Sequence, residues 1–396
     1  MNISRRRRGP DRVRAGAVVA LLTVLIVPGR TAADAHGRAA IEQAVISTYA
    51  RLAAAGYEDA AGGARALARS VDDFLDAPSA AGLDRARRTW IEARIPYAQT
   101  EAYRFYDGPI EAVEGLINSW PIDENLIDYV DGEPDAGIIN QPGRFPELSA
   151  SMIASLNEKD GEKNITAGFH AVEFLLWGQD LNDDGPGRRS YLDYRDDRGA
   201  HADRRREYLR LAAHLLVQDL ESVASQWQPG HADNYRARFL ALPPDEALTR
   251  ILKGVGILSG SELAGERLTV PYETKEQEDE HSCFSDNTQQ DILYDTLGIE
   301  SVVRGRYVRT NGEHVEGTSL ADLLARVDPA VAQRLTREVE VSVAAARLVP
   351  SPFDRSILGT DAAPGRIAIK SLITALRAQA DSIAQAGAAL GLKLNF

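Results

Sequence analysis

Apolar residues recur at helical spacing along most of this chain, and this periodicity constrains the fold more than any other feature. The first such helix face contains Ile41, Val45, Ile46, Tyr49 and Leu52. The same spacing predicts a long amphipathic helix over 206–227, and another from about Asp245 to Leu268 that closes before Pro271. Strand-like alternation is scarce, and SVVRGRYVRT at 301–310 is the best candidate for a hairpin. We therefore expect an all-α protein with at most a small β-hairpin.

Helix-stop signals suggest how the helices are grouped. The helix over 206–227 is followed by Pro229 and Gly230, a pair that ends helices. We predict two helical-bundle domains, at residues 36–230 and 231–396. The two halves also share an order of motifs: TEAYRFYDGP then WPIDENLIDYV in the first, SELAGERL then EQEDEHSCFSD in the second. This similarity indicates an internal pseudo-duplication.

The N-terminus has the three parts of a signal peptide. Four arginines at 5–8 precede an apolar run from Ala15 to Val27, and Ala-Asp-Ala follows at 33–35. We predict a signal peptide over residues 1–35. An uncleaved membrane anchor is the alternative, but the apolar run is shorter than the roughly 20 residues that span a bilayer. No cysteine follows the run, so we expect a periplasmic protein that is not a lipoprotein, with the Sec or twin-arginine route left open.

Net charge and cysteine content limit the classes of ligand and the covalent links that this chain can have. The chain has a net charge of −13, and removal of residues 1–35, with seven Arg and two Asp, makes it −18. Such a surface disfavours nucleic acid and anionic membranes and attracts cations. Cys283 is the single cysteine, so no intrachain disulfide forms.

The strongest candidate site is GFHAVE, in which His170 and Glu173 lie three residues apart within a predicted helix. This spacing places both side chains on one helix face. Imidazole and carboxylate ligate iron, zinc and related ions. Gly168 just before the pair permits close approach of another backbone segment. The alternative is structural, with His170 bound to a carbonyl and Glu173 to an arginine.

A second polar cluster, KEQEDEHSCFSDNT, contains Glu280, His281 and Asp286. Glu278 and His281 have the Glu-x-x-His spacing of helical di-iron proteins. The GFHAVE motif has the reverse order, so we do not expect a ferritin-like oxidase centre. A solvated acidic loop is the alternative for this cluster.

Two Glu and Arg combinations complete the candidate set. Glu101 and Arg104 are spaced for an intrahelical pair, and SELAGERL supplies Arg267 in a similar setting. Buried between bundles, these arginines would instead orient a carboxylate ligand. No zinc-protease, nucleophile-elbow, phosphate-loop or dinucleotide motif is present in the sequence, and we predict no catalytic residue.

Several of these motifs resemble one known family. NITAGFHAVEFLLWGQDL resembles the Gly-x-His-x-x-Glu region of the imelysin family, also known as peptidase M75. TEAYRFYDGPIE, INSWPIDENLIDYV, RRREYL and EDEHSCFSDNT look like the iron-regulated protein A branch, over roughly residues 40–390. The resemblance implies an exported all-helical protein with two bundle-like domains, a site near their interface and an association with iron uptake.

Transferred to this chain, the resemblance implies a metal site and its surroundings. The expected ligands are His170, Glu173, Glu280 and His281. The expected surrounding residues are Gly168, Glu101, Arg104, Asp123, Glu124, Arg267, Ser285 and Asp286.

Three functions remain open. The first is iron binding, in preference to zinc, in an uptake system that includes an inner- or outer-membrane transporter. The second is a zinc-dependent metallopeptidase of the imelysin type, which we rank lower because the zinc-protease motif is missing. The third is a module that binds a carboxylate ligand or a ferric chelate. Whether the chain is an enzyme at all, and its oligomeric state, stay open.

Overall fold

The structure is a computed structural model that describes residues 32–182 and 185–395. Residues 1–31 of the predicted signal peptide lie outside this range, so the peptide and its cleavage site stay predictions. In the described part of the chain, no helix is long and apolar enough to cross a membrane.

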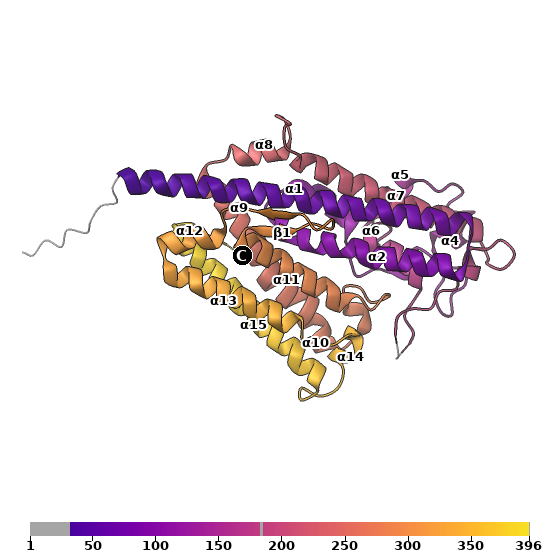
Figure 1. Ribbon diagram of the computed structural model, residues 1–396. Helices are drawn as coiled ribbons and strands as arrows, with labels where there is room; N and C mark the ends of the chain where they lie inside the picture. Colours follow the sequence, from indigo (N-terminus) through magenta and orange to yellow (C-terminus); the bar gives the residue numbers. More distant parts are fainter. Residues whose placement is uncertain (1–31, 183–184, 396) are drawn as a thin grey trace, which may run out of the picture.

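Four helices from the first half of the chain pack together: α1 (Ala32–Asp76), α2 (Ala80–Thr100), α6 (Gly168–Trp177) and α7 (Ala202–Trp227). A short connection joins α1 to α2. The Ser79 side chain fixes the start of α2 by accepting a hydrogen bond from the Gly82 N–H. Figure 1 shows α1 running along the length of the molecule. Short elements fill the remainder: η1 (Glu101–Tyr103), η2 (Pro109–Ala112), α3 (Glu114–Ile117), η3 (Glu124–Leu126), α4 (Gly137–Asn140), α5 (Ala150–Leu156) and η4 (Tyr191–Tyr194).

A second group of helices comes from the later half of the chain. It contains α9 (Pro244–Ile257), the π-helix η5 (Leu258–Thr269), α10 (Val270–Thr274), α11 (Thr288–Arg304), α13 (Pro329–Ala346) and α15 (Pro364–Leu390). The shorter elements here are α8 (Tyr235–Leu240), η6 (Gln277–Asp279), α12 (Leu320–Val327) and α14 (Phe353–Ile357). In Figure 1 the orange and yellow helices α12, α13, α14 and α15 lie below α1 and α2.

The predicted end of one helix is wrong. Helical structure does not stop before Pro271 but runs from α9 through η5 into α10 and ends at Thr274. Pro271 lies in the first turn of α10, a position at which proline is tolerated. The wide π-helical turns before it shift the hydrogen-bond register, so the chain passes the proline without a break.

A small hairpin is present and forms the one β-sheet among the described residues, but it is shifted from the predicted 301–310, because residues 301–304 belong to α11 and the second strand begins at His314. Strands β1 (Arg306–Val308) and β2 (His314–Glu316) pair antiparallel, with Tyr307 opposite Val315. The all-α fold with a small hairpin is therefore confirmed.

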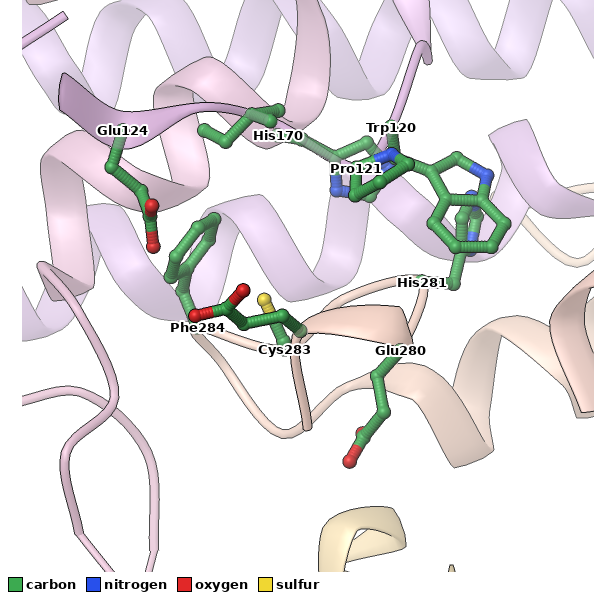
Figure 2. Close-up of a pocket in the computed structure, with 10 residues that line it drawn as sticks. Trp120, Pro121, Glu124, His170, Glu280, His281, Cys283 and Phe284 are labelled. Atoms are coloured by element: carbon green, nitrogen blue, oxygen red, sulfur yellow. The ribbon is translucent and has the colours of Figure 1, made fainter. Parts of the chain in front are cut away.

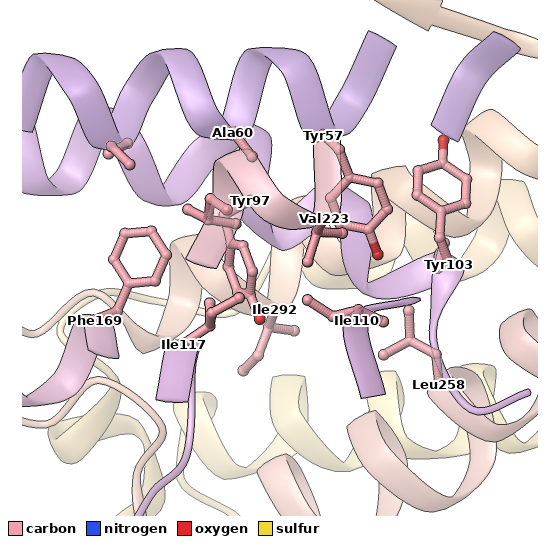
Figure 3. Close-up of a cluster of buried hydrophobic side chains, with 14 of the residues drawn as sticks. Tyr57, Ala60, Tyr97, Tyr103, Ile110, Ile117, Phe169, Val223, Leu258 and Ile292 are labelled. Carbon is pink, nitrogen blue, oxygen red and sulfur yellow. The ribbon is translucent and has the colours of Figure 1, made fainter. Parts of the chain in front are cut away.

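One continuous set of buried side chains connects both helix groups. Figure 3 shows Tyr57 from α1, Tyr97 from α2 and Phe169 from α6 in the same cluster as Leu258 from η5 and Ile292 from α11. The predicted boundary at residue 230 falls in the connection between α7 and α8. The division into two domains and the pseudo-duplication stay predictions.

Candidate functional site

A small cavity lies where α6, the segment before η3 and the loop between η6 and α11 meet (Figure 2). Its volume is about 20 Å³, which is room for one water molecule or one bare ion. It is lined by Trp120, Pro121, Ile122, Glu124, His170, Glu278, Glu280, His281, Cys283 and Phe284. Segments more than 150 residues apart in sequence therefore build one site.

Gly168 allows α6 to begin at this place. Its φ is +82°, and a Cβ there would lie 2.6 Å from the carbonyl oxygen of Ile117. Only glycine adopts this backbone conformation freely and leaves room for the crossing chain. All ten residues of α6 are buried, so the helix brings its two polar side chains, His170 and Glu173, into the interior of the protein.

His170 and Glu173 form the predicted pair, and Ser285 holds it. Nδ1 of His170 lies 2.9 Å from Oε2 of Glu173. The other carboxylate oxygen, Oε1, accepts hydrogen bonds from the Ser285 N–H at 2.9 Å and its hydroxyl at 2.7 Å. Both oxygens of Glu173 are thus engaged. Nε2 of His170 is buried without a hydrogen-bond partner, and it is the atom of this pair that remains available to a ligand.

Burial controls the charge of the pair. It lowers the pKa of His170 well below its usual range, and the neighbouring His281 lowers it further. Burial raises the pKa of Glu173 to about 8, against the opposing effect of the Ser285 hydrogen bond. Burial thus favours the uncharged form of each group, and a ligand at Nε2 of His170 requires the tautomer in which Nδ1–H donates to Glu173.

His281 lies beside His170, with ring centroids 4.8 Å apart. Its Nδ1 is 3.1 Å from Oδ2 of Asp291, and its Nε2 is 3.3 Å from the amide nitrogen of Asn118. Burial lowers the pKa of His281 to about 3, and the charge of Arg267 acts in the same direction. A neutral His281 that donates to Asp291 and accepts from Asn118 has both ring nitrogens in use.

Arg94 holds the groups behind His281 in place. Its guanidinium contacts Asp291 at 3.0 Å and also donates to the side-chain oxygen of Asn118. Burial and the Arg94 charge have opposite effects on Asp291, and the net result is a pKa well below the usual range of a carboxyl. Asp291 is therefore an anion that fixes the orientation of His281. The sequence did not predict that four further residues belong to the site, because no local motif marks residues that meet only in the folded chain. These residues are Arg94, Asn118, Trp120 and Asp291.

The structure separates Glu280 from the histidines. Part of Glu280 lines the cavity, but its carboxylate points away from His170 and His281 (Figure 2). Burial raises the pKa of Glu280 well above its usual range, and Asp354 and Asp286 raise it further. Asp286 shows the same effect, since burial and Asp354 raise its pKa to about 7. These two predicted residues belong to an acidic cluster on the far side of the loop.

The predicted Glu101–Arg104 contact forms, but in a 3-10 turn. Oε2 of Glu101 accepts from Arg104 at 2.6 Å and from Arg267 at 2.7 Å, and Arg267 also reaches Asp295 at 2.8 Å. Against the effect of burial, Arg104 and Arg267 lower the pKa of Glu101 to about 2. None of these four residues lines the cavity. They form buried ion pairs that join η1, η5 and α11. Glu101, Arg104 and Arg267 were predicted to surround the metal, but they do not reach the cavity.

Two neighbouring acids differ in placement. Asp123 caps η3 by accepting a hydrogen bond from the Asn125 N–H at 3.2 Å and does not line the cavity. Glu124 lines it, with its carboxylate directed inward (Figure 2).

Among residues 32–182 and 185–395, no group of three or more His, Cys, Asp or Glu side chains is arranged to hold a metal ion. The metal-ligand set therefore stays a prediction. Among the cavity-lining residues, Nε2 of His170 and the two carboxylate oxygens of Glu280 are buried without a hydrogen-bond partner, and the Glu280 carboxylate points away from the histidines.

Comparisons with known proteins agree on one family. The imelysin (peptidase M75) family model matches residues 53–383. The chain is 26% identical over 355 residues to iron-regulated protein A from Synechococcus elongatus, covering 87% of this chain and 82% of that protein. Similar folds occur in the crystal structures of an iron-regulated protein A precursor from Parabacteroides distasonis and an imelysin-like protein from Psychrobacter arcticum.

The first of these structures gives a TM-score of 0.66 at 19% identity and covers 87% of this chain and 95% of that one. The second gives 0.59 at 15% identity, with coverage of 90% and 98%. These likenesses support the helical fold, and the family match extends over most of the sequence, including the Gly168–Glu173 motif. The chain belongs to the imelysin family.

Proposed function

We propose that this protein binds one divalent metal ion, iron in preference to zinc, in the cavity beside His170, and serves in iron uptake. One observation carries the proposal. Nε2 of His170 is buried, has no hydrogen-bond partner and borders a cavity of about 20 Å³. Buried polar atoms are normally paired, so an unpaired nitrogen at a cavity of this size supports a partner there, either a water molecule or the metal ion that we propose.

Glu173 acts in this proposal as the residue that orients His170. Its Oε2 faces Nδ1 at 2.9 Å, and a histidine that ligates through one nitrogen commonly hydrogen-bonds a carboxylate through the other. His281 has both nitrogens engaged, so it shapes the wall. The carboxylates that line the cavity, Glu124 and Glu278, supply the remaining oxygen donors. Imidazole with carboxylates suits iron, whereas a thiolate-rich set would favour zinc.

The role in uptake rests on kinship and on the sequence. One relative is named iron-regulated protein A, which points to a link with iron supply. From the predicted signal peptide we expect the mature chain in the periplasm, where it would deliver metal to a membrane transporter. Binding is favoured over peptide hydrolysis because a cavity of about 20 Å³ has no space for a peptide bond and its flanking residues.

The test is a metal-binding measurement on the mature chain. Purified protein is incubated anaerobically with Fe²⁺ or Zn²⁺, freed of excess ion, and analysed for bound metal by mass spectrometry. We expect one Fe per chain in the wild type and almost none in His170→Ala. His214→Ala is the matched control, because His214 is a histidine on the exposed face of α7 paired with Asp72. Equal iron in His170→Ala and the wild type would contradict the proposal.

A further inference from the structure

A second cavity adjoins the His170 cavity and opens toward the surface. Its volume is about 320 Å³, and it is lined by Glu124, Gln179, Asp180, Leu181, Glu276, Gln277, Glu278, Cys283 and Phe284. Four of these residues, Glu124, Glu278, Cys283 and Phe284, also line the small cavity. The two spaces are therefore consecutive. We call them the outer cavity and the inner cavity.

Charge is distributed unevenly along this path. Glu276 lines only the outer cavity and Glu278 lines both, and each is exposed. Glu124 and Asp180 are half-buried, and His170 at the inner end is only 2% exposed. Among the described residues that line either cavity, none is Lys or Arg. Walls of one sign with little solvent between them concentrate the opposite charge, so the outer cavity attracts cations toward the unpaired Nε2 of His170.

The two volumes set what can pass. A divalent ion in water carries six waters, and because one water needs about 10–15 Å³ of cavity volume, these six require roughly 60–90 Å³. This hydrated ion fits the outer cavity of about 320 Å³ but not the inner cavity of about 20 Å³. Waters must be lost between the two spaces. The shared lining places the carboxylates of Glu124 and Glu278 at that junction, where oxygen ligands can replace water.

We infer that the ligand of this protein is a hydrated divalent cation that sheds its waters at the junction of the two cavities, and not a metal chelate. The inference rests on the proposed function and specifies its substrate. A chelate keeps a shell of organic ligands that the inner cavity cannot contain. An ion that releases water slowly, such as Mg²⁺, is disfavoured at the same step.

The experiment compares two cobalt probes by stopped-flow fluorescence. Trp120 lines the inner cavity with its ring 5.2 Å from that of His281, so Co²⁺ in the inner cavity should quench it, and the signal should be absent in Trp120→Phe. Hexaamminecobalt(III) has the size of a hydrated ion but does not exchange its ligands. We expect it to slow Co²⁺ loading by occupying the outer cavity, without quenching Trp120 itself.

Charge variants test the outer cavity separately. Asp180 and Glu276 line only the outer cavity, and the double variant Asp180→Asn, Glu276→Gln should load Co²⁺ about tenfold more slowly at low salt. Raising the salt concentration should reduce this difference. The control, Glu313→Gln with Asp381→Asn, removes two exposed charges elsewhere on the surface and should load at the wild-type rate.

The outcomes separate the two levels of the argument. If wild type and His170→Ala retain the same amount of iron, the proposed function fails. If wild type binds Co²⁺ through His170 but the Asp180, Glu276 variant loads at the control rate, the outer cavity is not the path. If Fe³⁺–EDTA quenches Trp120 to the same extent as Co²⁺ and remains bound as the intact chelate, the inferred substrate is wrong.

Discussion

Ser285 holds Glu173 through two hydrogen bonds to the same carboxylate oxygen, one from its backbone N–H at 2.9 Å and one from its hydroxyl at 2.7 Å. This contact joins α6 of the first helix group to the loop that precedes α11 of the second. Because Glu173 in turn positions His170, the two helix groups must be in register for the free nitrogen to face the cavity. The geometry of the site is thus coupled to the packing of the two groups.

Substitution Ser285→Ala should weaken metal binding. It removes the hydroxyl bond but keeps the backbone bond, so Glu173 and His170 lose part of their orientation. Changes in residues that position a ligating histidine typically reduce metal affinity by about 10- to 100-fold. Competition with a chromogenic chelator measures the affinity. Ser222→Ala, on the exposed face of α7, is the control, and a similar affinity in both variants would speak against the Ser285 contact.

Substitution Gly168→Ala should destabilise the protein strongly. The new Cβ would lie 2.6 Å from the Ile117 carbonyl oxygen, in a backbone conformation with φ of +82°. Gly132→Ala is a matched control, because Gly132 has φ of +80° and nothing within 4 Å of the added atom. The control should lose only about 1–2 kcal/mol of unfolding free energy, which is the cost of placing an alanine in a left-handed backbone conformation.

The difference in urea unfolding free energy between the two glycine variants isolates the close approach of α6 to Ile117. We expect it to exceed about 2 kcal/mol, as overpacking against a rigid backbone does. Equal losses in the two variants would show that the backbone conformation alone requires glycine at this position.

Substitution Asp286→Asn should stabilise the protein in alkaline solution. The folded-state pKa of about 7 is above the roughly 3.9 of a free Asp. The native state therefore binds the proton more tightly, and wild-type stability falls as the pH rises from about 4 to about 7. Asparagine does not ionise and so avoids the cost of a buried negative charge. The variant should therefore be more stable than wild type above pH 7 and equally stable below pH 4.

The size of this gain is about 1 kcal/mol once the partial solvent screening of Asp286 is allowed for. Asparagine also tolerates the left-handed backbone at this position, where φ is +58°. Asp160→Asn is the control, since Asp160 has φ of +66° but is exposed. Thermal unfolding at pH 5 and pH 8 measures the stability of both variants. A stability gain of Asp286→Asn that is independent of pH would refute the titration of Asp286.

Substitution Asp128→Asn should have the opposite pH dependence. Asp128 is fully buried between Arg189 and Arg205, with a contact of 2.7 Å to the second. Its pKa is held well below the usual range by both arginines, against the effect of burial. The ion pairs therefore add stability above the unfolded pKa of about 3.9, and this is lost as the pH falls toward the depressed folded value.

At pH 7 the Asp128 variant should lose about 3–5 kcal/mol, because two buried guanidinium groups lose their counter-ion. Its difference from wild type should shrink progressively below pH 4. Asp197→Asn removes a carboxylate from an exposed Arg195 pair and should change stability little at either pH. Urea unfolding at pH 7 and pH 3 decides between these expectations.

Local spacing determined much of this protein. The helices follow from the recurrence of apolar residues, and the His170–Glu173 contact follows from a separation of three residues within a helix, since both depend on near neighbours in the chain. The predicted hairpin at 301–310 contained only the first strand, since the second strand lies at His314–Glu316. Pro271 misled the prediction because a proline stops a helix only where its N–H would have been needed.

Tertiary structure decided which atoms of those residues are available. Ser285 engages Glu173, and Asn118 with Asp291 engages His281, so of the two histidines at the cavity only His170 keeps an unpaired ring nitrogen. The orientation of Glu280 away from the histidines was equally invisible in its motif. Each of these contacts joins segments distant in the chain, and their formation depends on how the two helix groups pack, a property that no single stretch of sequence contains.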